Sequence, residues 1–256
     1  MAIDLHRHPP MTLARLRARH AWILPVAIVL FTLLAIGALF DALPWDQAIT
    51  NAAVDARTGW LLQFARRISF MGSTPVVFAV SGIAALFAVK RCPRLALAIV
   101  VVAFARPVIE WGLKELIDRP RPTGDQLVRG RGPSFPSGHP LATAASWCML
   151  PLVVALYTKQ RVIWWAIAVS VWVLAVLVAA SRVFLGVHWA SDVVASLLLA
   201  IVGVAAVERV VESTHGVNRC EVQLPRAARR PDAASQSPSL QGNPGTGDGS
   251  SHPSTA

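Results

Sequence analysis

The sequence predicts an all-α fold, a polytopic membrane helical bundle with six transmembrane helices. Of the 256 residues, 54% are hydrophobic and only 15% are charged, and the mean hydropathy is +0.52. Soluble globular domains carry about 25% charged residues, so this composition excludes an ordinary soluble protein. Six apolar runs, each near the roughly 20 residues that a helix needs to cross a bilayer, span residues 21–40, 74–89, 95–113, 140–157, 162–180 and 189–207.

The first apolar run, residues 21–40, follows a segment rich in arginine. It is too long for the hydrophobic region of a signal peptide, and no cleavage site between small residues closes it. We therefore expect residues 1–20 to be a basic cytoplasmic N-terminus that precedes a first transmembrane helix. The second run, residues 74–89, is the shortest of the six.

Basic residues between the other runs predict the orientation of the chain. Lys and Arg mark the second connection at residues 90–94, the fourth at 159–161 and the chain from 209 onward. Cytoplasmic loops carry an excess of these residues, so we expect both termini in the cytoplasm and the first, third and fifth connections outside. The third connection breaks the rule, which indicates a functional cause. Its basic residues are Lys114, Arg119, Arg121, Arg129 and Arg131.

Composition also divides the chain into a membrane domain and a tail. Residues 21–211 contain all six runs, whereas residues 212–256 are rich in Pro, Ser, Gly and Ala and are expected to form a disordered cytoplasmic tail. The net charge of +10 does not indicate nucleic acid as a partner, because the cations lie mainly in membrane-flanking loops and the tail. The three cysteines have no metal-ligand spacing.

Two polar clusters on the outward side each have an ordinary explanation when taken alone. The first, "KELIDRPRP" at residues 114–122, supplies Lys114 and Arg121 as cations, although a basic segment beside a membrane helix is more often an anchor than a site. The second, "PSFPSGHP" at residues 133–140, places Ser137 at a helix start. Such an end can bind an anion through its free backbone N–H groups, or it can simply be a capped helix.

A third cluster, "SRVFLGVHWASD" at residues 181–192, places charged groups between two strongly apolar segments. Charged groups at membrane depth are costly and are usually functional. His188 and Asp192 are four residues apart, so on a helix they share one face and the carboxylate can fix the imidazole tautomer. The other ring nitrogen is then free to act as a nucleophile or base, and Arg182 lies just upstream.

Together, the three clusters indicate a phosphoryl group as the substrate. Three cations and helix-start N–H groups around two histidines suit phosphoryl transfer, which needs charge stabilisation on the equatorial oxygens and an in-line nucleophile. No carboxylate cluster suited to Mg²⁺ accompanies them, so we expect no metal and no other cofactor. The cations would do the work that metal ions do elsewhere.

The clusters resemble the signature of the type 2 phosphatidic acid phosphatases, integral membrane lipid phosphatases related to the vanadium haloperoxidases. That signature reads K-x6-R-P, then P-S-G-H, then S-R-x5-H-x3-D. The matching residues are Lys114, Arg121 and Pro122, then Pro136, Ser137, Gly138 and His139, then Ser181, Arg182, His188 and Asp192. The resemblance spans the second to the sixth apolar run. Ser196 stands where that family commonly has a glycine.

The resemblance implies a role for each motif residue. His188 attacks phosphorus and becomes a phosphohistidine, Asp192 holds the other nitrogen of that ring, and His139 protonates the leaving oxygen. The implied phosphate-binding residues are Lys114, Arg121, Ser137, Gly138 and Arg182. His139 later takes a proton from the water that releases the phosphate. The two histidines need opposite protonation states, so the rate should be bell-shaped in pH.

The resemblance also implies a lipid phosphate or diphosphate as the partner, and we expect a bacterial inner membrane as the location. The distribution of basic residues predicts that the active site lies on its extracytoplasmic face. Phosphatidic acid, phosphatidylglycerol phosphate and undecaprenyl diphosphate all fit. A phosphotransferase of the same fold remains open, as does a non-catalytic lipid-binding protein, although both histidines and Asp192 are intact. Outside the motifs, Arg106 and Glu110 are expected to pair four residues apart, as a structural pair more than as support beneath Lys114.

Overall fold

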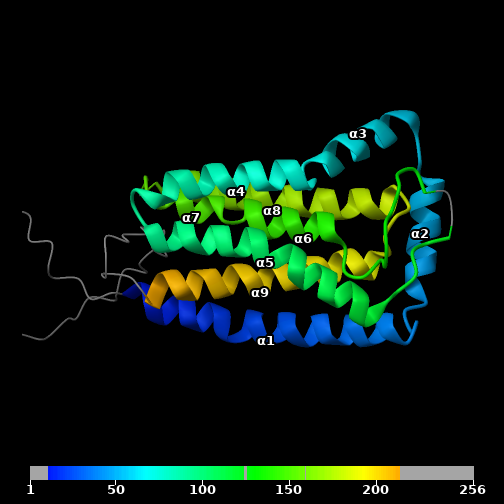
Figure 1. Cartoon of the computed structure of the whole chain (residues 1–256), viewed down its shortest axis with the longest axis horizontal. Coiled ribbons are helices and arrows are strands. Elements are labelled where there is room, and N and C mark those ends of the chain that lie inside the picture. The colour runs from blue at the N-terminus through cyan, green and yellow to red at the C-terminus, as the bar shows by residue number, and fades with distance from the viewer. Residues whose placement is uncertain (1–10, 124–125, 159, 214–256) are drawn as a thin grey trace, which may run out of the picture. The chain divides into compact units, whose positions relative to one another are not determined.

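The fold is a bundle of α-helices, shown in Figure 1. The computed structural model describes residues 11–123, 126–158 and 160–213, and within these ranges it contains helices and no strand. The helices are α1 (Met11–Leu39), α2 (Trp45–Asp55), α3 (Gly59–Phe70), α4 (Thr74–Val89), α5 (Pro93–Ile117), α6 (Gly138–Trp147), α7 (Leu150–Val154), α8 (Arg161–Phe184) and α9 (Ala190–Ser213). The predicted all-α class is confirmed. Most of the expected tail, residues 214–256, lies outside the described residues.

The helices differ in their ability to cross a membrane. Among the described residues, α1, α5, α8 and α9 are long and apolar enough to span it, and α3 with α4 adds a fifth span if that pair, bent by 46°, is counted as one. The fourth expected run is divided into α6 and the short α7, whose first turn contains Pro151. Proline cannot donate a backbone hydrogen bond, which favours a new helix start there. Six spans therefore remain a prediction.

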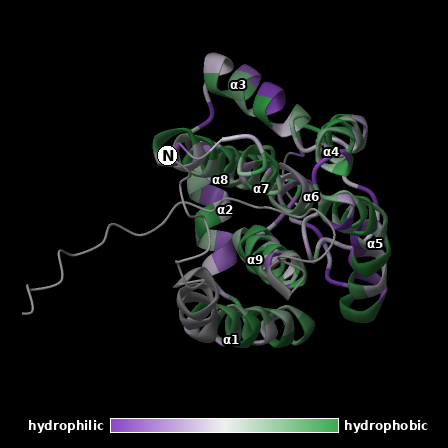
Figure 2. Cartoon of the chain, turned by 90° about the vertical axis from the view of Figure 1, so that its left-hand side faces the viewer, coloured by the Kyte–Doolittle hydropathy of each residue, from purple (hydrophilic) through white to green (hydrophobic). Residues whose placement is uncertain are grey.

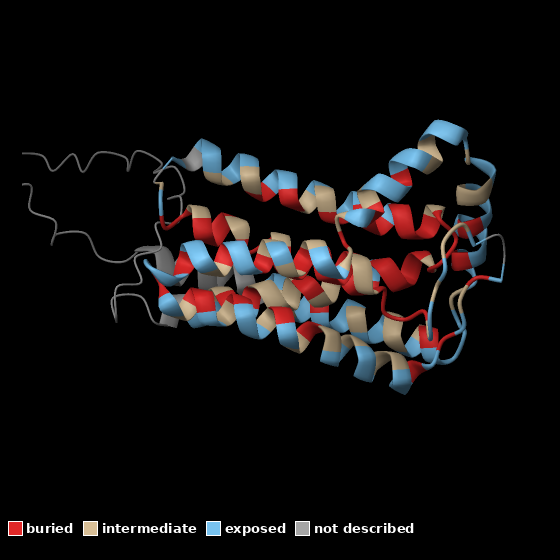
Figure 3. Ribbon diagram, turned by 45° about the horizontal axis from the view of Figure 1, so that its top comes forward, coloured by how far each residue is buried: buried red, intermediate tan, exposed pale blue. Residues whose placement is uncertain are grey.

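Helix α6 occupies the centre of the bundle. It packs against α4, α5, α8 and α9, and α1 lies against α9 on one side. Every residue of α6 from Pro140 to Ser146 is buried. Figure 3 shows that buried residues follow the inward faces of the helices, while the outward faces are exposed. The first turn of α6 is thus held by neighbours on several sides, so side chains that it carries have little freedom to move.

The outward faces of the long helices are apolar. Figure 2 shows hydrophobic residues along α1, α4, α5 and α9, whereas hydrophilic residues gather on α2, α3 and the connections. Leu33, Phe104 and Val173 are large hydrophobic side chains that remain more than half exposed. Patches of this kind are rare on soluble monomers and suit contact with lipid. The fold therefore belongs in a membrane, with its polar groups at the ends of the helices.

The loop between α5 and α6 closes one end of the bundle. Helix α5 ends at Ile117 and is followed by Asp118, which has a left-handed conformation (φ 43°) that aspartate tolerates better than most residues. Beyond it, the Ser134 N–H donates to the Arg119 carbonyl at 2.8 Å. The indole Nε1 of Trp189, which precedes α9, donates to the Pro120 carbonyl at 2.9 Å. These bonds bring the first motif, the start of α6 and the α8–α9 turn together.

Candidate active site

His188 lies in the turn between α8 and α9, two residues before α9 begins at Ala190. It therefore does not share a helix face with Asp192 as the spacing predicted. The turn nevertheless brings His188 Nδ1 to 3.4 Å from Asp192 Oδ2. This distance is longer than an ordinary hydrogen bond, so the carboxylate orients the ring mainly through its charge.

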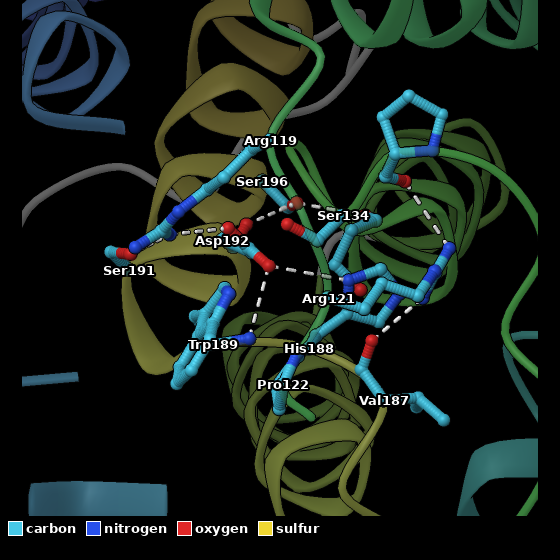
Figure 4. Close-up of polar contacts among 12 residues, drawn as sticks. Arg119, Arg121, Pro122, Ser134, Val187, His188, Trp189, Ser191, Asp192 and Ser196 are labelled. Atoms are coloured by element: carbon cyan, nitrogen blue, oxygen red, sulfur yellow. Dashed lines mark hydrogen bonds and ion pairs between the residues drawn. The ribbon is translucent and has the colours of Figure 1, made fainter. Parts of the chain in front are cut away.

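The other ring nitrogen of His188 faces a cation. Arg121 Nη1 lies 3.2 Å from His188 Nε2 (Figure 4). A guanidinium can only donate, so Nε2 must carry a lone pair and the ring proton sits on Nδ1, facing Asp192. This is the tautomer that leaves Nε2 free to attack an electrophile.

The surroundings of His188 keep its ring neutral. The pKa of His188 is lowered to about 4, mainly by burial; Asp192 acts in the opposite direction, and the positive charges of Arg121 and Arg182 contribute to the lowering. At neutral pH the imidazole therefore has no second proton. Its lone pair on Nε2 is available without prior deprotonation.

Arg121 is held in place by the loop that carries it. Its Nε donates to the Gly132 carbonyl at 2.8 Å and its Nη1 to the Val187 carbonyl at 2.6 Å. Its Nη2 donates to the carbonyls of Arg131 and Pro133 at 2.8 and 3.2 Å. These contacts and the one to His188 occupy every N–H of the guanidinium. A phosphate oxygen that binds Arg121 must therefore replace one of them.

Lys114, in the last turn of α5, points toward the same loop. Its Nζ donates to the Pro133 carbonyl at 3.0 Å and lies 3.8 Å from a carboxylate oxygen of Glu110. Glu110 in turn accepts from Arg106 at 2.8 Å, which confirms the expected pair. The Glu110 carboxylate also lies directly against the Cα of Gly138, where any larger residue would collide with it. The pair thus lies under the start of α6 as well as under Lys114.

Ser137 caps α6 without the side-chain hydrogen bond that a cap usually makes. Its backbone N–H donates to the Asp192 carbonyl at 3.3 Å, and its own carbonyl accepts from Ser196 Oγ at 2.7 Å. The Ser137 Oγ is buried and has no partner among the described residues. A buried hydroxyl of this kind is costly unless a ligand can bond it. Ser196 thus ties the second motif to the third.

Arg182 lies in the last turn of α8 and is buried. Its Nη1 donates to Ser69 Oγ of α3 at 2.6 Å, while its Nε has no partner in the described part of the chain. Ser69 is 5% exposed and belongs to none of the three motifs. The Arg182 Nε and the Ser137 Oγ are therefore two buried donors that a bound phosphate could satisfy.

His139 lies in the first turn of α6, just before the expected apolar run. Its pKa is lowered to about 3, mainly because the ring is buried and also because of unfavourable electrostatic interactions with Arg182, His188, Arg106 and Lys114. Cations of the first and third motifs, Lys114 and Arg182, therefore lie near this imidazole, together with Arg106. An anion bound among them would offset their charge and favour protonation of His139.

Asp192 is fully buried, and its two oxygens have different partners. Oδ2 accepts from the Trp189 backbone N–H at 3.0 Å and faces His188. Oδ1 accepts from Arg119 Nη1 at 2.8 Å. Sequence reasoning counted Arg119 among the basic residues of the third connection but gave it no role. Its position two residues before Arg121 was the only signal.

The expected site residues lie together at the end of the bundle where α5, α6 and the α8–α9 turn meet. Within the described residues, no group of three or more His, Cys, Asp or Glu side chains could hold a metal ion. A neutral imidazole, a carboxylate behind it and several cations near a helix start lie together at one end of a membrane bundle, an arrangement suited to a phosphoryl group. The sequence profile of the PAP2 superfamily matches residues 94–214. With the relatives below, this match shows that the chain belongs to the PAP2 superfamily, the family of the type 2 phosphatidic acid phosphatases.

Two Bacillus subtilis comparisons support this membership. The chain is 31% identical over 190 residues to phosphatidylglycerophosphatase B of Bacillus subtilis strain 168. This alignment covers 69% of this chain and 89% of the relative. The crystal structure of a transmembrane PAP2-type phosphatidylglycerolphosphate phosphatase from Bacillus subtilis matches with a TM-score of 0.69 and 26% identity. That match covers 77% of this chain and 100% of the other.

A more distant structure shares the fold. The crystal structure of Aquifex aeolicus LpxE matches with a TM-score of 0.51 and 23% identity, and covers 64% of this chain and 94% of the other. The family match begins at residue 94, so α2 and α3, which supply Asp46 and Ser69, lie upstream of it.

Proposed function

We propose that this protein is a membrane lipid phosphatase that removes a terminal phosphate from a lipid phosphate or diphosphate through a phosphohistidine on His188. One observation carries the proposal. His188 Nε2 holds a lone pair 3.2 Å from the Arg121 guanidinium, and its Nδ1 faces Asp192. A nucleophile is thereby placed beside a group that binds phosphate oxygens bidentately.

Substrate binding places phosphorus between the nucleophile and the cations. A phosphate oxygen takes the place of His188 Nε2 on Arg121, and others bond Lys114 and Arg182. The unpaired Ser137 Oγ and the N–H of Gly138 complete the cradle at the start of α6, where the helix dipole favours negative charge. Each of these donors lies on a different element, so the cradle needs the folded bundle.

The reaction then proceeds in two displacements. His188 Nε2 attacks phosphorus, the bond to the lipid oxygen breaks, and His139 gives that oxygen a proton. In the second displacement His139 takes a proton from water, the water oxygen bonds phosphorus, and the P–N bond breaks to release inorganic phosphate. Asp192 stabilises the positive imidazole ring that exists between the two steps. The proton on His139 comes from the bound phosphate monoanion, because its own pKa of about 3 leaves it neutral at pH 7 in the free protein.

The substrate class follows from the place of the site. It lies at the end of a bundle whose outward faces suit lipid, so a phosphate on a lipid head group can reach it from the membrane surface. The named Bacillus subtilis relatives are phosphatidylglycerolphosphate phosphatases, which favours that lipid as a first substrate to test. Phosphatidic acid and undecaprenyl diphosphate carry the same terminal group and belong in the same assay.

The test is phosphate release by the purified protein in detergent from each of these three lipids. We expect release from at least one, and we expect His188→Ala to lose it by about 10⁴-fold or more while Arg129→Ala, at an exposed position, retains it. If phosphate leaves the lipid only when an alcohol or a second lipid is added, the protein is a phosphotransferase. No loss of lipid phosphate under either condition would refute the proposal.

We also propose that catalysis needs no metal, because Lys, Arg and backbone N–H groups supply the positive charge around phosphate. Treatment with EDTA should leave kcat within about twofold of the untreated value, which corresponds to a change in activation free energy of at most roughly 0.4 kcal/mol. Vanadate, which adopts the geometry of the transferring phosphoryl group, should inhibit. Activity that is lost to EDTA and regained with Mg²⁺ would contradict this mechanism.

A further inference from the structure

A buried ion-pair network extends from the catalytic carboxylate to α2. Arg119 is 3% exposed, and its two terminal nitrogens bond different carboxylates. Nη1 lies 2.8 Å from Asp192 Oδ1, and Nη2 lies 2.8 Å from Asp46 Oδ2. Asp46 is 2% exposed and lies in the first turn of α2, 73 residues before Arg119. The three charges therefore form a chain that leads away from His188.

Ser191 closes this network. Its Oγ accepts from Arg119 Nη1 at 2.6 Å and donates to Asp46 Oδ2. Its backbone N–H donates to Asp46 Oδ1 at 2.9 Å. Both oxygens of each carboxylate are thus engaged, as buried charges require. Figure 4 shows Arg119 between Ser191 and Asp192, on the side of Asp192 that faces away from His188.

The charges of the network match the charge that the reaction creates. Two carboxylates and one guanidinium carry a net charge of about −1, which faces a neutral imidazole before the reaction. When Nε2 bonds phosphorus, the imidazole ring becomes positive, and the network then balances it. If Asp46 were absent, Arg119 would cancel Asp192 before the reaction began.

We propose that Asp46 and Arg119 are positioning residues for phosphoryl transfer: Arg119 fixes Asp192 against His188, and Asp46 balances Arg119 so that Asp192 keeps its negative charge toward the imidazole. This inference rests on the proposed function of His188. It assigns a role in catalysis to α2, which lies outside the three motifs and outside the family match.

The alternative is that the network only fastens α2 to the bundle. A fastening role would change the amount of folded protein but not the behaviour of each folded site. The two roles differ most in the titration of His188, which Asp192, Arg121, Arg182 and His139 surround. Removing the negative charge of Asp46 should lower the pKa of His188, and removing the positive charge of Arg119 should raise it. A structural brace predicts no such opposite pair of shifts.

The experiment compares Asp46→Asn and Arg119→Gln with the wild-type protein in detergent. Turnover is divided by the number of sites that a labelled phosphoenzyme trap detects, so unfolded protein does not count. We expect kcat per site to fall about tenfold to a hundredfold in both, as for partners that orient a reactive group, with KM changed by less than about threefold. The acid limb of kcat/KM should move to lower pH in Asp46→Asn and to higher pH in Arg119→Gln, each by roughly half a pH unit or more.

Two further comparisons isolate the role of Asp192. In an Asp192→Asn background neither substitution should lower kcat again, because the charge that they serve is gone. Asp55→Asn, at the exposed end of α2, and Arg129→Gln, at an exposed position in the α5–α6 loop, are the matched controls and should leave kcat and the pH profile unchanged. If the Arg119→Gln protein does not accumulate in the cell, Ser191→Ala can test the network instead, because it removes one member with little change in volume.

Three results would overturn the inference: unchanged kcat per site in both variants, equal losses with and without the Asp192 carboxylate, or acid limbs that move in the same direction. The titration of His188 can also be followed by NMR of isotope-labelled histidine in the intact protein. Opposite shifts in that measurement support the network even if no lipid phosphate is hydrolysed, and parallel or absent shifts contradict it. Failure of the proposed function and failure of this inference are therefore separate observations.

Discussion

His188 and His139 have different surroundings, which predict different defects when each is removed. His188 faces Asp192 and Arg121, which suits the proposed role of nucleophile. His139 lies in the first turn of α6 near several cations, which suits a group that donates and accepts a proton beside an anion.

The first prediction separates the two histidines by leaving group. His188→Ala should abolish turnover of every phosphate ester, because no other side chain of the site can accept the phosphoryl group in line. His139→Ala should fail at the first displacement with phosphatidic acid, whose alkoxide leaves poorly without a proton. A diphosphate expels a phosphate monoester with a second pKa of about 6, so the phosphoenzyme should still form and accumulate.

Labelled phosphate on the protein is the measurement for this prediction. With His139→Ala we expect a burst and a trapped phosphoenzyme from a diphosphate or p-nitrophenyl phosphate, but none from phosphatidic acid. Equal trapping from all substrates would remove the acid role from His139. If label never appears on position 188 under any condition, His188 is not the nucleophile.

The second prediction concerns pH. In the free protein the pKa of His188 is about 4, so kcat/KM should fall below that pH as Nε2 takes a proton, and should be constant from there to the start of the high-pH limb. At high pH the limb should belong to the substrate, because neutral His139 needs the proton of a phosphate monoanion. The second pKa of a phosphate monoester is about 6, so kcat/KM should fall above it.

Two substrates that differ in the second pKa of their phosphate show whether the high-pH limb comes from the substrate or from a protein group. The high-pH limb should move with the substrate, while the acid limb near pH 4 stays in place. A high-pH limb that is the same for both substrates would assign it to a protein group. An acid limb near the ordinary histidine pKa of about 6.5 would mean that His188 is not buried as described.

At the scale of elements, the turn between α3 and α4 approaches α6 closely. A Cβ at Gly72 would lie 2.9 Å from the His139 carbonyl and 2.8 Å from Thr143 Oγ1. The Thr143 hydroxyl already bonds that carbonyl at 2.8 Å, so the first turn of α6 has no room to yield on this side. The turn at the 46° bend between α3 and α4 therefore lies against the backbone of His139 in the candidate active site.

The third prediction follows from this contact. Gly72→Ala should displace the backbone of His139 and lower kcat by roughly tenfold to a hundredfold, because small misplacements of a reacting group are costly. Gly82→Ala in α4, where a Cβ meets nothing within 4 Å, is the matched control and should keep wild-type kcat. The measurement is kcat from steady-state kinetics of the two purified variants and the wild-type protein. Equal activity would mean that α6 adapts to the larger residue.

Ser69 on α3 bears on the site in a second way, through its hydrogen bond to Arg182. Helices α2 and α3 thus each supply one buried polar side chain to an arginine at the site, Asp46 to Arg119 and Ser69 to Arg182. These two helices cover the end of the bundle where the motifs meet, as Figure 1 shows. We expect the first connection to be part of the catalytic machinery as well as a link between spans.

At the scale of the whole molecule, the proposed orientation places the site outside the cytoplasm, because the basic N-terminus and the second and fourth connections mark the inner side. The fourth prediction tests this with cysteine labelling. Cysteine at Thr123, exposed in the α5–α6 loop, should react with an impermeant thiol reagent in intact cells. Cysteine at Gln160, exposed in the fourth connection, should react only after lysis.

The wild-type protein, labelled in parallel, corrects for its native cysteines. The opposite pattern, with Gln160→Cys labelled in intact cells and Thr123→Cys protected, would place the site in the cytoplasm. It would leave the chemistry of the site unchanged, because that chemistry depends on contacts within the bundle. It would instead restrict the substrates to lipid phosphates of the inner leaflet.

The sequence by itself determined the all-α membrane class, because composition and the length of apolar runs are local properties. It also determined the three clusters and the Arg106–Glu110 pair, since residues four apart on a helix are neighbours whatever the rest of the chain does. It did not predict that His188 lies in a turn, or that the fourth run is broken into α6 and α7.

Only the tertiary structure decided which polar residues from elsewhere join the site. Asp46 lies 145 residues from Ser191, and Ser69 lies 113 residues from Arg182. In the sequence, an aspartate in a first helical turn and a serine near a helix end are ordinary residues. Their partners depend on how α2 and α3 pack against α8 and α9, and a buried charge must find its partner within reach of that packing.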